Sequence, residues 1–108
     1  MENAIPRPDT VNKLRSAADA AFAMLAGMQL ELFTPLKAGP KTAEDIAHTI
    51  GVAPTRLRLL LYSLVAAGLL TEEHGHFSNS PEAEQFLVKG RSFLYRKLAR
   101  NLFQPMGS

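Results

Sequence analysis

The segment from Val11 to Leu32 constrains the fold of this chain most, because its apolar residues follow two helical patterns at once. One pattern has the a and d spacing of a heptad repeat, which places its members on one stripe of a helix. These members are Val11, Leu14, Ala18, Ala21, Leu25, Met28 and Leu32. A second set off this stripe consists of Phe22, Met24, Leu30 and Phe33. A helix that is apolar over so much of its circumference must be covered on more than one side.

We predict that a second copy of the chain covers the heptad stripe, in an intertwined homodimer. A single domain of 108 residues has few other elements that can cover two faces of a long helix. Ala18 and Ala21 are small enough to let a partner helix approach closely. The predicted interface consists of Val11, Leu14, Ala18, Ala21, Phe22, Leu25, Met28 and Leu32. The alternative is that a C-terminal helix of the same chain folds back over the second face.

Prolines, glycines and capping residues set the expected limits of this first helical region. Residues 1–10 contain two prolines and are predicted to form an extended lead-in, with Asp9 or Thr10 as the N-cap. Gly27 is expected to mark a bend or break between two helices, and Pro35 ends the region because it cannot continue a helix.

A helix-turn-helix is predicted in the middle of the chain. Thr42 can cap a short helix whose first turn is acidic, and Gly51 can supply the left-handed residue just past its end. Pro54 suits the first position of the next helix, and Gly68 is expected to end it. Two helices joined by a short turn that contains glycine are typical of this motif.

A small β-hairpin, or wing, is expected next, with strands at residues 69–73 and 76–78 around a His74-Gly75 turn. The order helix, helix, helix-turn-helix and wing predicts a mainly α winged helix-turn-helix fold with extra N- and C-terminal helices.

The extra helices at the C-terminal end are placed by their capping residues. A short helix is predicted to start at Ser80 and to bury Phe86 and Leu87. Ser92 can cap a last amphipathic helix, which Pro105 stops.

The composition predicts one domain at residues 11–104, followed by a tail at 105–108, of which Gly107-Ser108 has the form of a cloning remnant. Cysteine is absent and the N-terminus lacks the basic start and apolar stretch of a secretory signal. We therefore expect a cytoplasmic protein. The longest apolar run is shorter than the roughly 20 residues needed to span a bilayer, so no membrane association is expected.

The second helix of the predicted helix-turn-helix would enter the major groove if the chain bound DNA. It offers Thr55, Arg56 and Arg58, but its remaining residues make it apolar nearly all round, which favours burial on both sides over base reading. The basic residues near the C-terminal end could also contact phosphates. These are Lys89, Arg91, Arg96, Lys97 and Arg100. A stand-alone winged-helix DNA-binding transcriptional regulator remains the alternative, and the short chain favours it.

The three histidines do not form a convincing reactive or metal-binding group. His74 and His76 flank the glycine of a turn, and their only further partner would be the distant His48. Solvated turn residues are the expected interpretation, and no metal site or catalytic residue is predicted.

Several short sequences, taken in their order and spacing, carry a family resemblance. They are Leu30-Glu31-Leu32-Phe33, Gly39-Pro40-Lys41-Thr42-Ala43-Glu44-Asp45-Ile46-Ala47, Gly51-Val52, the run from Arg56 to Leu61, and Ala67-Gly68-Leu69-Leu70. Over roughly Val11 to Phe103, the chain resembles the N-terminal dimerisation domain of the S-adenosylmethionine-dependent small-molecule O-methyltransferases. This group includes plant phenylpropanoid and bacterial polyketide-tailoring enzymes.

The resemblance implies that the domain interlocks with its copy, while a separate C-terminal Rossmann-like domain binds S-adenosylmethionine. It also implies that the first helices and the last helix give apolar walls to the pocket of a small, aromatic hydroxylated acceptor. The candidates are Phe22, Met24, Phe93 and Phe103. The seven glycines include no Gly-x-Gly. We therefore expect no catalysis and no cofactor binding by this chain itself.

Overall fold

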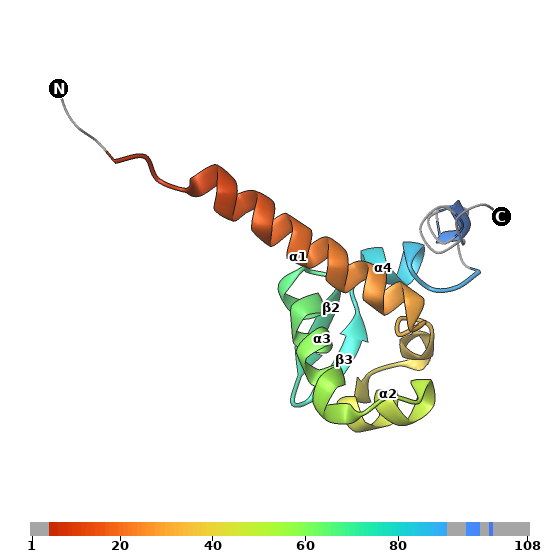
Figure 1. Cartoon of the computed structure of the whole chain (residues 1–108). Coiled ribbons are helices and arrows are strands. Elements are labelled where there is room, and N and C mark those ends of the chain that lie inside the picture. Colours follow the sequence, from red (N-terminus) through yellow and green to blue (C-terminus); the bar gives the residue numbers. More distant parts are fainter. Residues whose placement is uncertain (1–4, 91–94, 98–99, 101–108) are drawn as a thin grey trace.

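The computed structural model of the chain describes residues 5–90, 95–97 and 100. Its elements, in chain order, are α1 (Asp9–Gln29), the 3-10 helix η1 (Pro35–Ala38), β1 (Lys41–Thr42), α2 (Ala43–Ile50), α3 (Pro54–Ala66), β2 (Leu70–Glu73), β3 (His76–Asn79) and α4 (Pro81–Phe86). The predicted fold class is confirmed: α2 and α3 form the helix-turn-helix, and β2 and β3 form the wing (Figure 1).

Local capping chemistry explains where the two helices of the helix-turn-helix begin and end. The hydroxyl of Thr42 accepts a hydrogen bond from the backbone N–H of Asp45 at 3.1 Å, as an N-cap should. Gly51 follows α2 in the left-handed conformation, with φ of 77°. Pro54 occupies the first position of α3, where its missing N–H costs nothing. These three sequence predictions are confirmed.

The prediction that Gly27 bends or breaks the first helix is wrong, because α1 is continuous from Asp9 to Gln29. Gly27 is buried, and a Cβ placed on it would lie only 2.9 Å from Cε2 of the Phe33 ring. The glycine therefore allows a close approach between the helix and this ring. The chain turns at Glu31, whose φ is 55°. No second α-helix lies between Gly27 and Pro35 in this described segment, and the short 3-10 helix η1 begins at Pro35.

The start of α1 also differs slightly from the expectation. Its N-cap is Pro8, which makes no capping hydrogen bond from a side chain, and Asp9 is the first helical residue. Asp9 thus lies in the first turn, where an acid complements the positive end of the helix dipole.

The wing is part of a three-stranded antiparallel sheet with the order β1-β3-β2. Leu70 of β2 pairs with Asn79 of β3, and Lys41 of β1 pairs with Phe77. The sequence did not predict β1, because two residues are too few to show the alternation that indicates a strand.

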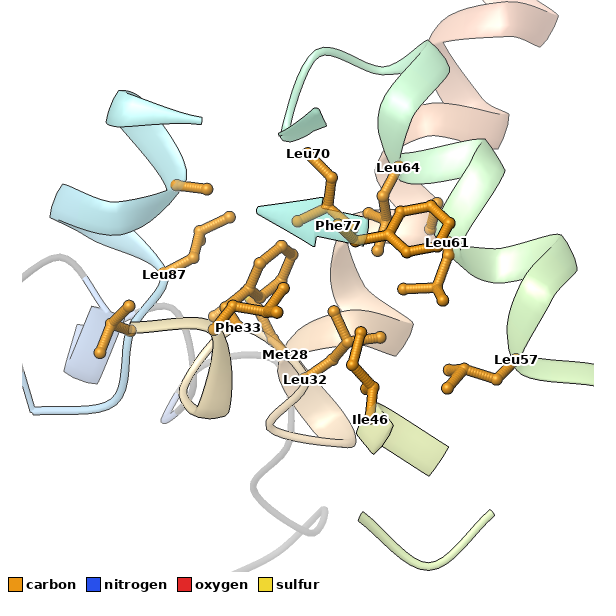
Figure 2. Packing of buried hydrophobic residues seen from close by; sticks show 14 of the residues in the cluster. Met28, Leu32, Phe33, Ile46, Leu57, Leu61, Leu64, Leu70, Phe77 and Leu87 are labelled. Atoms are coloured by element: carbon orange, nitrogen blue, oxygen red, sulfur yellow. The ribbon is translucent and has the colours of Figure 1, made fainter. Parts of the chain in front are cut away.

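The core lies where α1, α2, α3 and the sheet converge, as Figure 2 shows. Its largest fully buried side chains are Phe33, Phe77, Met28, Leu32, Ile46, Leu61, Leu64, Leu70 and Val88. Leu87 is buried as predicted, but Phe86 is exposed and that prediction is wrong. Ala83 of α4 and Leu87, the residue just after the helix, are buried, whereas Phe86 at the end of α4 is 37% exposed.

The predicted last helix falls mostly outside the described residues. Tyr95, Arg96, Lys97 and Arg100 are helical, and Tyr95 is buried. In the part of the chain that the structure describes, no helix combines the length and the apolar character needed to cross a membrane.

Candidate dimer interface

The helix α1 has an inner face that packs on its own domain. Ala23, Gly27 and Met28 are buried on this side, and Met24 packs against the core. The helix α3 is the main neighbour of α1. The chain itself therefore covers one of the two apolar faces of this helix.

The opposite face of α1 carries an outer stripe, which we define as Val11, Leu14, Ala18, Ala21, Phe22 and Leu25. The exposed fractions of Val11, Leu14 and Phe22 are 66%, 65% and 72%. Ala18 and Ala21 are exposed and Leu25 is half-buried. Figure 1 shows that the N-terminal half of α1 extends away from the rest of the domain. Large apolar side chains on a projecting helix form the kind of surface that marks an interaction site.

Two residues predicted for the interface lie elsewhere. Met28 and Leu32 are fully buried in the core of the single chain. A straight α-helix drifts by about 20° per heptad, so the heptad pattern turns from the outer stripe at its start toward the inner face at Met28. Leu32 lies beyond the end of α1 at Gln29. Neither residue is part of the outer stripe.

The candidate residues for an acceptor-pocket wall are not brought together within one chain. Phe22 is exposed on the outer stripe, whereas Met24 packs against the core. Two residues apart on a helix means a rotation of about 200°, so the two side chains leave α1 on opposite sides. Phe93 and Phe103 lie outside the described residues.

A hollow of about 330 Å³ lies where the end of α1 meets the start of α3. Its lining is apolar except for one arginine, and consists of Leu30, Val52, Ala53, Arg56, Leu57 and Leu60. The sequence pattern did not reveal this hollow, since its walls come from three segments that approach one another only in the folded chain. Helix periodicity marked Leu30 as apolar and off the heptad stripe, which was the one available signal.

The outer face of α3 is exposed to solvent in the single chain. The prediction that this helix is buried on both sides is therefore wrong for the single chain. Leu59 is 76% exposed and Tyr62 is exposed beside it, with its ring edge-on to Phe77 at a centroid separation of 5.3 Å. Arg58 forms an ion pair with Glu44 of α2. Of the two arginines on this helix, Arg58 is neutralised by Glu44 and Arg56 lines the apolar hollow, and the side chain between them is apolar. This is not the donor array that reads DNA bases, so the DNA-binding alternative is not favoured.

The histidines occupy the positions expected from the sequence. His74, with φ of 53°, lies in the turn between β2 and β3, and His48 is exposed on α2. Among the described residues, no group of three or more histidines, cysteines or acids is arranged to hold a metal ion.

Comparison with known proteins identifies the family. The family model described as the O-methyltransferase dimerisation domain matches residues 14–89. This chain belongs to that family. The match covers α1 from Leu14 onward, the helix-turn-helix, the wing and α4, so the dimerisation domain includes most of the outer stripe.

Curated relatives of this dimerisation domain are methyltransferases. The chain is 35% identical over 80 residues to the N,N-dimethyltransferase OxyT of Streptomyces rimosus, covering 74% of this chain and 23% of that protein. It is 34% identical over 85 residues to acetylserotonin O-methyltransferase of Mus musculus, covering 73% of this chain and 22% of that protein. The chain thus spans less than a quarter of the length of these relatives.

Solved structures share the fold. The chain superimposes on PigF with SAH at a TM-score of 0.74 and 22% identity, covering 93% of this chain and 33% of PigF. It superimposes on an O-methyltransferase family 2 protein from Planctomyces limnophilus in complex with apigenin at a TM-score of 0.73 and 22% identity. That match covers 91% of this chain and 30% of that protein.

Proposed function

We propose that this dimerisation domain joins two methyltransferase subunits by pairing the outer stripe of α1 with the same stripe of a second copy. The observation that carries the proposal is the exposure of Val11, Leu14 and Phe22 on a helix whose other face is already packed. Each of these side chains contributes about 1.5–3 kcal/mol when it is fully buried. In a symmetric pair every contact occurs twice, so the stripe supports a stable dimer.

The methyl-transfer chemistry belongs, in this proposal, to a further domain of the kind that the rest of the relatives' length provides. S-adenosylmethionine would supply the methyl group there, and the SAH in PigF supports this assignment. The relatives differ in their named reactions, since OxyT is an N,N-dimethyltransferase and the mouse protein an O-methyltransferase. The residues of this chain position the two subunits and exclude water between them.

The acceptor, in the same proposal, is a small hydroxylated aromatic compound, and apigenin in the Planctomyces protein supports this class. Among the four wall candidates, Phe22 is the one that is both described and exposed in the single chain, so in the paired stripes it would line a pocket only where the two subunits meet. Met24 takes no part, since it packs against the core of its own chain.

A charge placed in the stripe tests the pairing. Ala18→Glu should raise the dimer dissociation constant more than about 100-fold, because two unpaired carboxylates would be buried close together at the helix crossing. Asn12→Glu is the matched control, since Asn12 is exposed on a different side of the same helix. Size-exclusion chromatography with light scattering measures the mass, and circular dichroism checks that each variant is folded.

The expected result is a dimer for the unmodified chain and for Asn12→Glu, and a folded monomer for Ala18→Glu. Random duplex DNA at low salt should leave the elution position unchanged. A monomeric unmodified chain, or an Ala18→Glu variant that stays dimeric, would refute pairing through this stripe.

A further inference from the structure

Five of the six residues of the outer stripe have a spacing that is the same in both directions along the helix. Val11, Leu14, Ala18, Phe22 and Leu25 are separated by three, four, four and three residues, and the sixth member, Ala21, has Arg15 as its counterpart about Ala18. Two copies of such a stripe match each other when the helices run antiparallel around a two-fold axis at Ala18. Val11 then faces Leu25 of the second copy, Leu14 faces Phe22, and the small Ala18 meets itself where the helices are closest.

This register carries the lead-in of one protomer to the end of the partner's helix. With Ala18 on the axis, Asp9 of one protomer lies level with Gly27 of the other. Leu30 is three residues further along, which is about 4.5 Å at the rise of an α-helix. The lead-in residues 5–8 are not helical and reach up to about 13 Å beyond Asp9 when extended. The lead-in must also cross the about 8–10 Å between the axes of two packed helices, which gives a total of about 9–11 Å, so residues 5–8 are long enough to reach the hollow beside Leu30.

The lead-in and the hollow have matching chemistry. Ile5 is 85% exposed in the single chain, and the described residues leave it open to solvent. The hollow offers apolar walls from Leu30, Val52 and Leu60, with a volume of about 330 Å³, which is ample for a branched aliphatic side chain. The prolines of the lead-in restrict its conformations, which lowers the entropy lost when it docks.

We infer that residues 5–8 of one protomer dock in the hollow of the partner, with Ile5 against Leu30, Val52 and Leu60. This inference rests on the proposed pairing of the outer stripes and adds to it a second, reciprocal contact at each end of the crossing. It assigns a function to the lead-in and to the hollow, neither of which is filled or covered by the residues that the structure describes.

Cysteine cross-linking tests the register and the docking separately, because the chain has no cysteine of its own. Ala18→Cys should oxidise to a disulfide-linked dimer, since the two residues meet on the axis. Ile5→Cys combined with Ala53→Cys should also link two chains, because Ala53 lines the hollow and is exposed. Within one chain the 21 residues of α1 lie between the lead-in and this hollow, so the link must join two protomers.

The single variants Ile5→Cys and Ala53→Cys, together with Asn12→Cys on another side of α1, are the controls and should stay unlinked. Mass spectrometry of the digested dimer should find the peptides of residues 5 and 53 joined. In the cysteine-free chain, Ile5→Asp should raise the dimer dissociation constant by about tenfold or more, and Ile5→Val by much less.

The outcomes separate the docking from the dimer on which it rests. A dimer in which Ala18→Cys cross-links, while residues 5 and 53 do not and Ile5→Asp has no effect, overturns the docking and leaves the hollow to another domain of a longer chain. Cross-linking through Phe22→Cys in place of Ala18→Cys overturns the register. A monomer in light scattering overturns the proposed pairing itself.

Discussion

Replacing Gly27 by alanine sets two effects of known size against each other. Alanine is about 1 kcal/mol more favourable than glycine inside a helix, so propensity alone predicts a more stable protein. The added Cβ, however, would lie 2.9 Å from Cε2 and 3.1 Å from Cζ of Phe33, and 3.4 Å from Cδ1 of Leu64. Both side chains are fully buried and have no room to move aside. Overpacking of this kind costs about 1–3 kcal/mol.

We therefore expect Gly27→Ala to lower the free energy of unfolding by about 1 kcal/mol, the balance of these two effects. Urea denaturation followed by circular dichroism measures the change, at one fixed protein concentration because assembly contributes to stability. Phe33→Leu removes the ring and serves as the matched background. In that background the alanine should be neutral or stabilising. A Gly27→Ala protein at least as stable as the unmodified chain would refute the close-approach explanation of this glycine.

Two further predictions concern a helix cap and a buried phenol. Thr42→Ala should lower the free energy of unfolding, measured by urea denaturation, by about 1 kcal/mol, because the backbone N–H of Asp45 loses its acceptor. Thr42→Ser keeps a hydroxyl at this position and should retain most of the stability of the unmodified chain. Burial, and secondarily the charge of Glu31, raises the pKa of Tyr95 above 10.0. Folding thus favours the neutral phenol, so stability is full below about pH 10 and falls above it, where the unfolded tyrosine ionises first. In a Tyr62→Phe variant, the phenolate absorbance of Tyr95 should show a titration midpoint above 10.0, and adding Glu31→Gln should lower that midpoint. A midpoint at 10.0 in the Tyr62→Phe variant would contradict this prediction.

The sequence predicts the helix-turn-helix well because its signals are local. A hydroxyl at Thr42, a left-handed glycine at position 51 and a proline at position 54 each act on the backbone within a few residues. Such residues favour the same backbone conformation whatever packs around them. The same holds for Ser80, whose side chain accepts a hydrogen bond from the N–H of Ala83 at 3.1 Å.

Prediction from the sequence is wrong where the structural role of a residue depends on a neighbour that is distant along the chain. A glycine in a helical pattern can permit a bend or a close approach, and only the position of Phe33 decides between them at Gly27. Helical spacing likewise gives the direction of a side chain without saying whether the chain itself covers it. Met28 and Phe22 were assigned to one interface for this reason, although the fold buries the first and exposes the second.

The projecting start of α1 links the amount of helix in this protein to its concentration. Residues 9–15 are exposed in the single chain, and their N-cap, Pro8, gives no capping hydrogen bond from a side chain. Lengthening a helix gains little free energy per residue in water, so without a partner the chain stabilises these turns only weakly. In the proposed pairing, contact with a second copy stabilises them, and their ordering and the association of two chains then form one equilibrium. The proposal therefore predicts that dilution lowers the helix content of α1 and that assembly restores it.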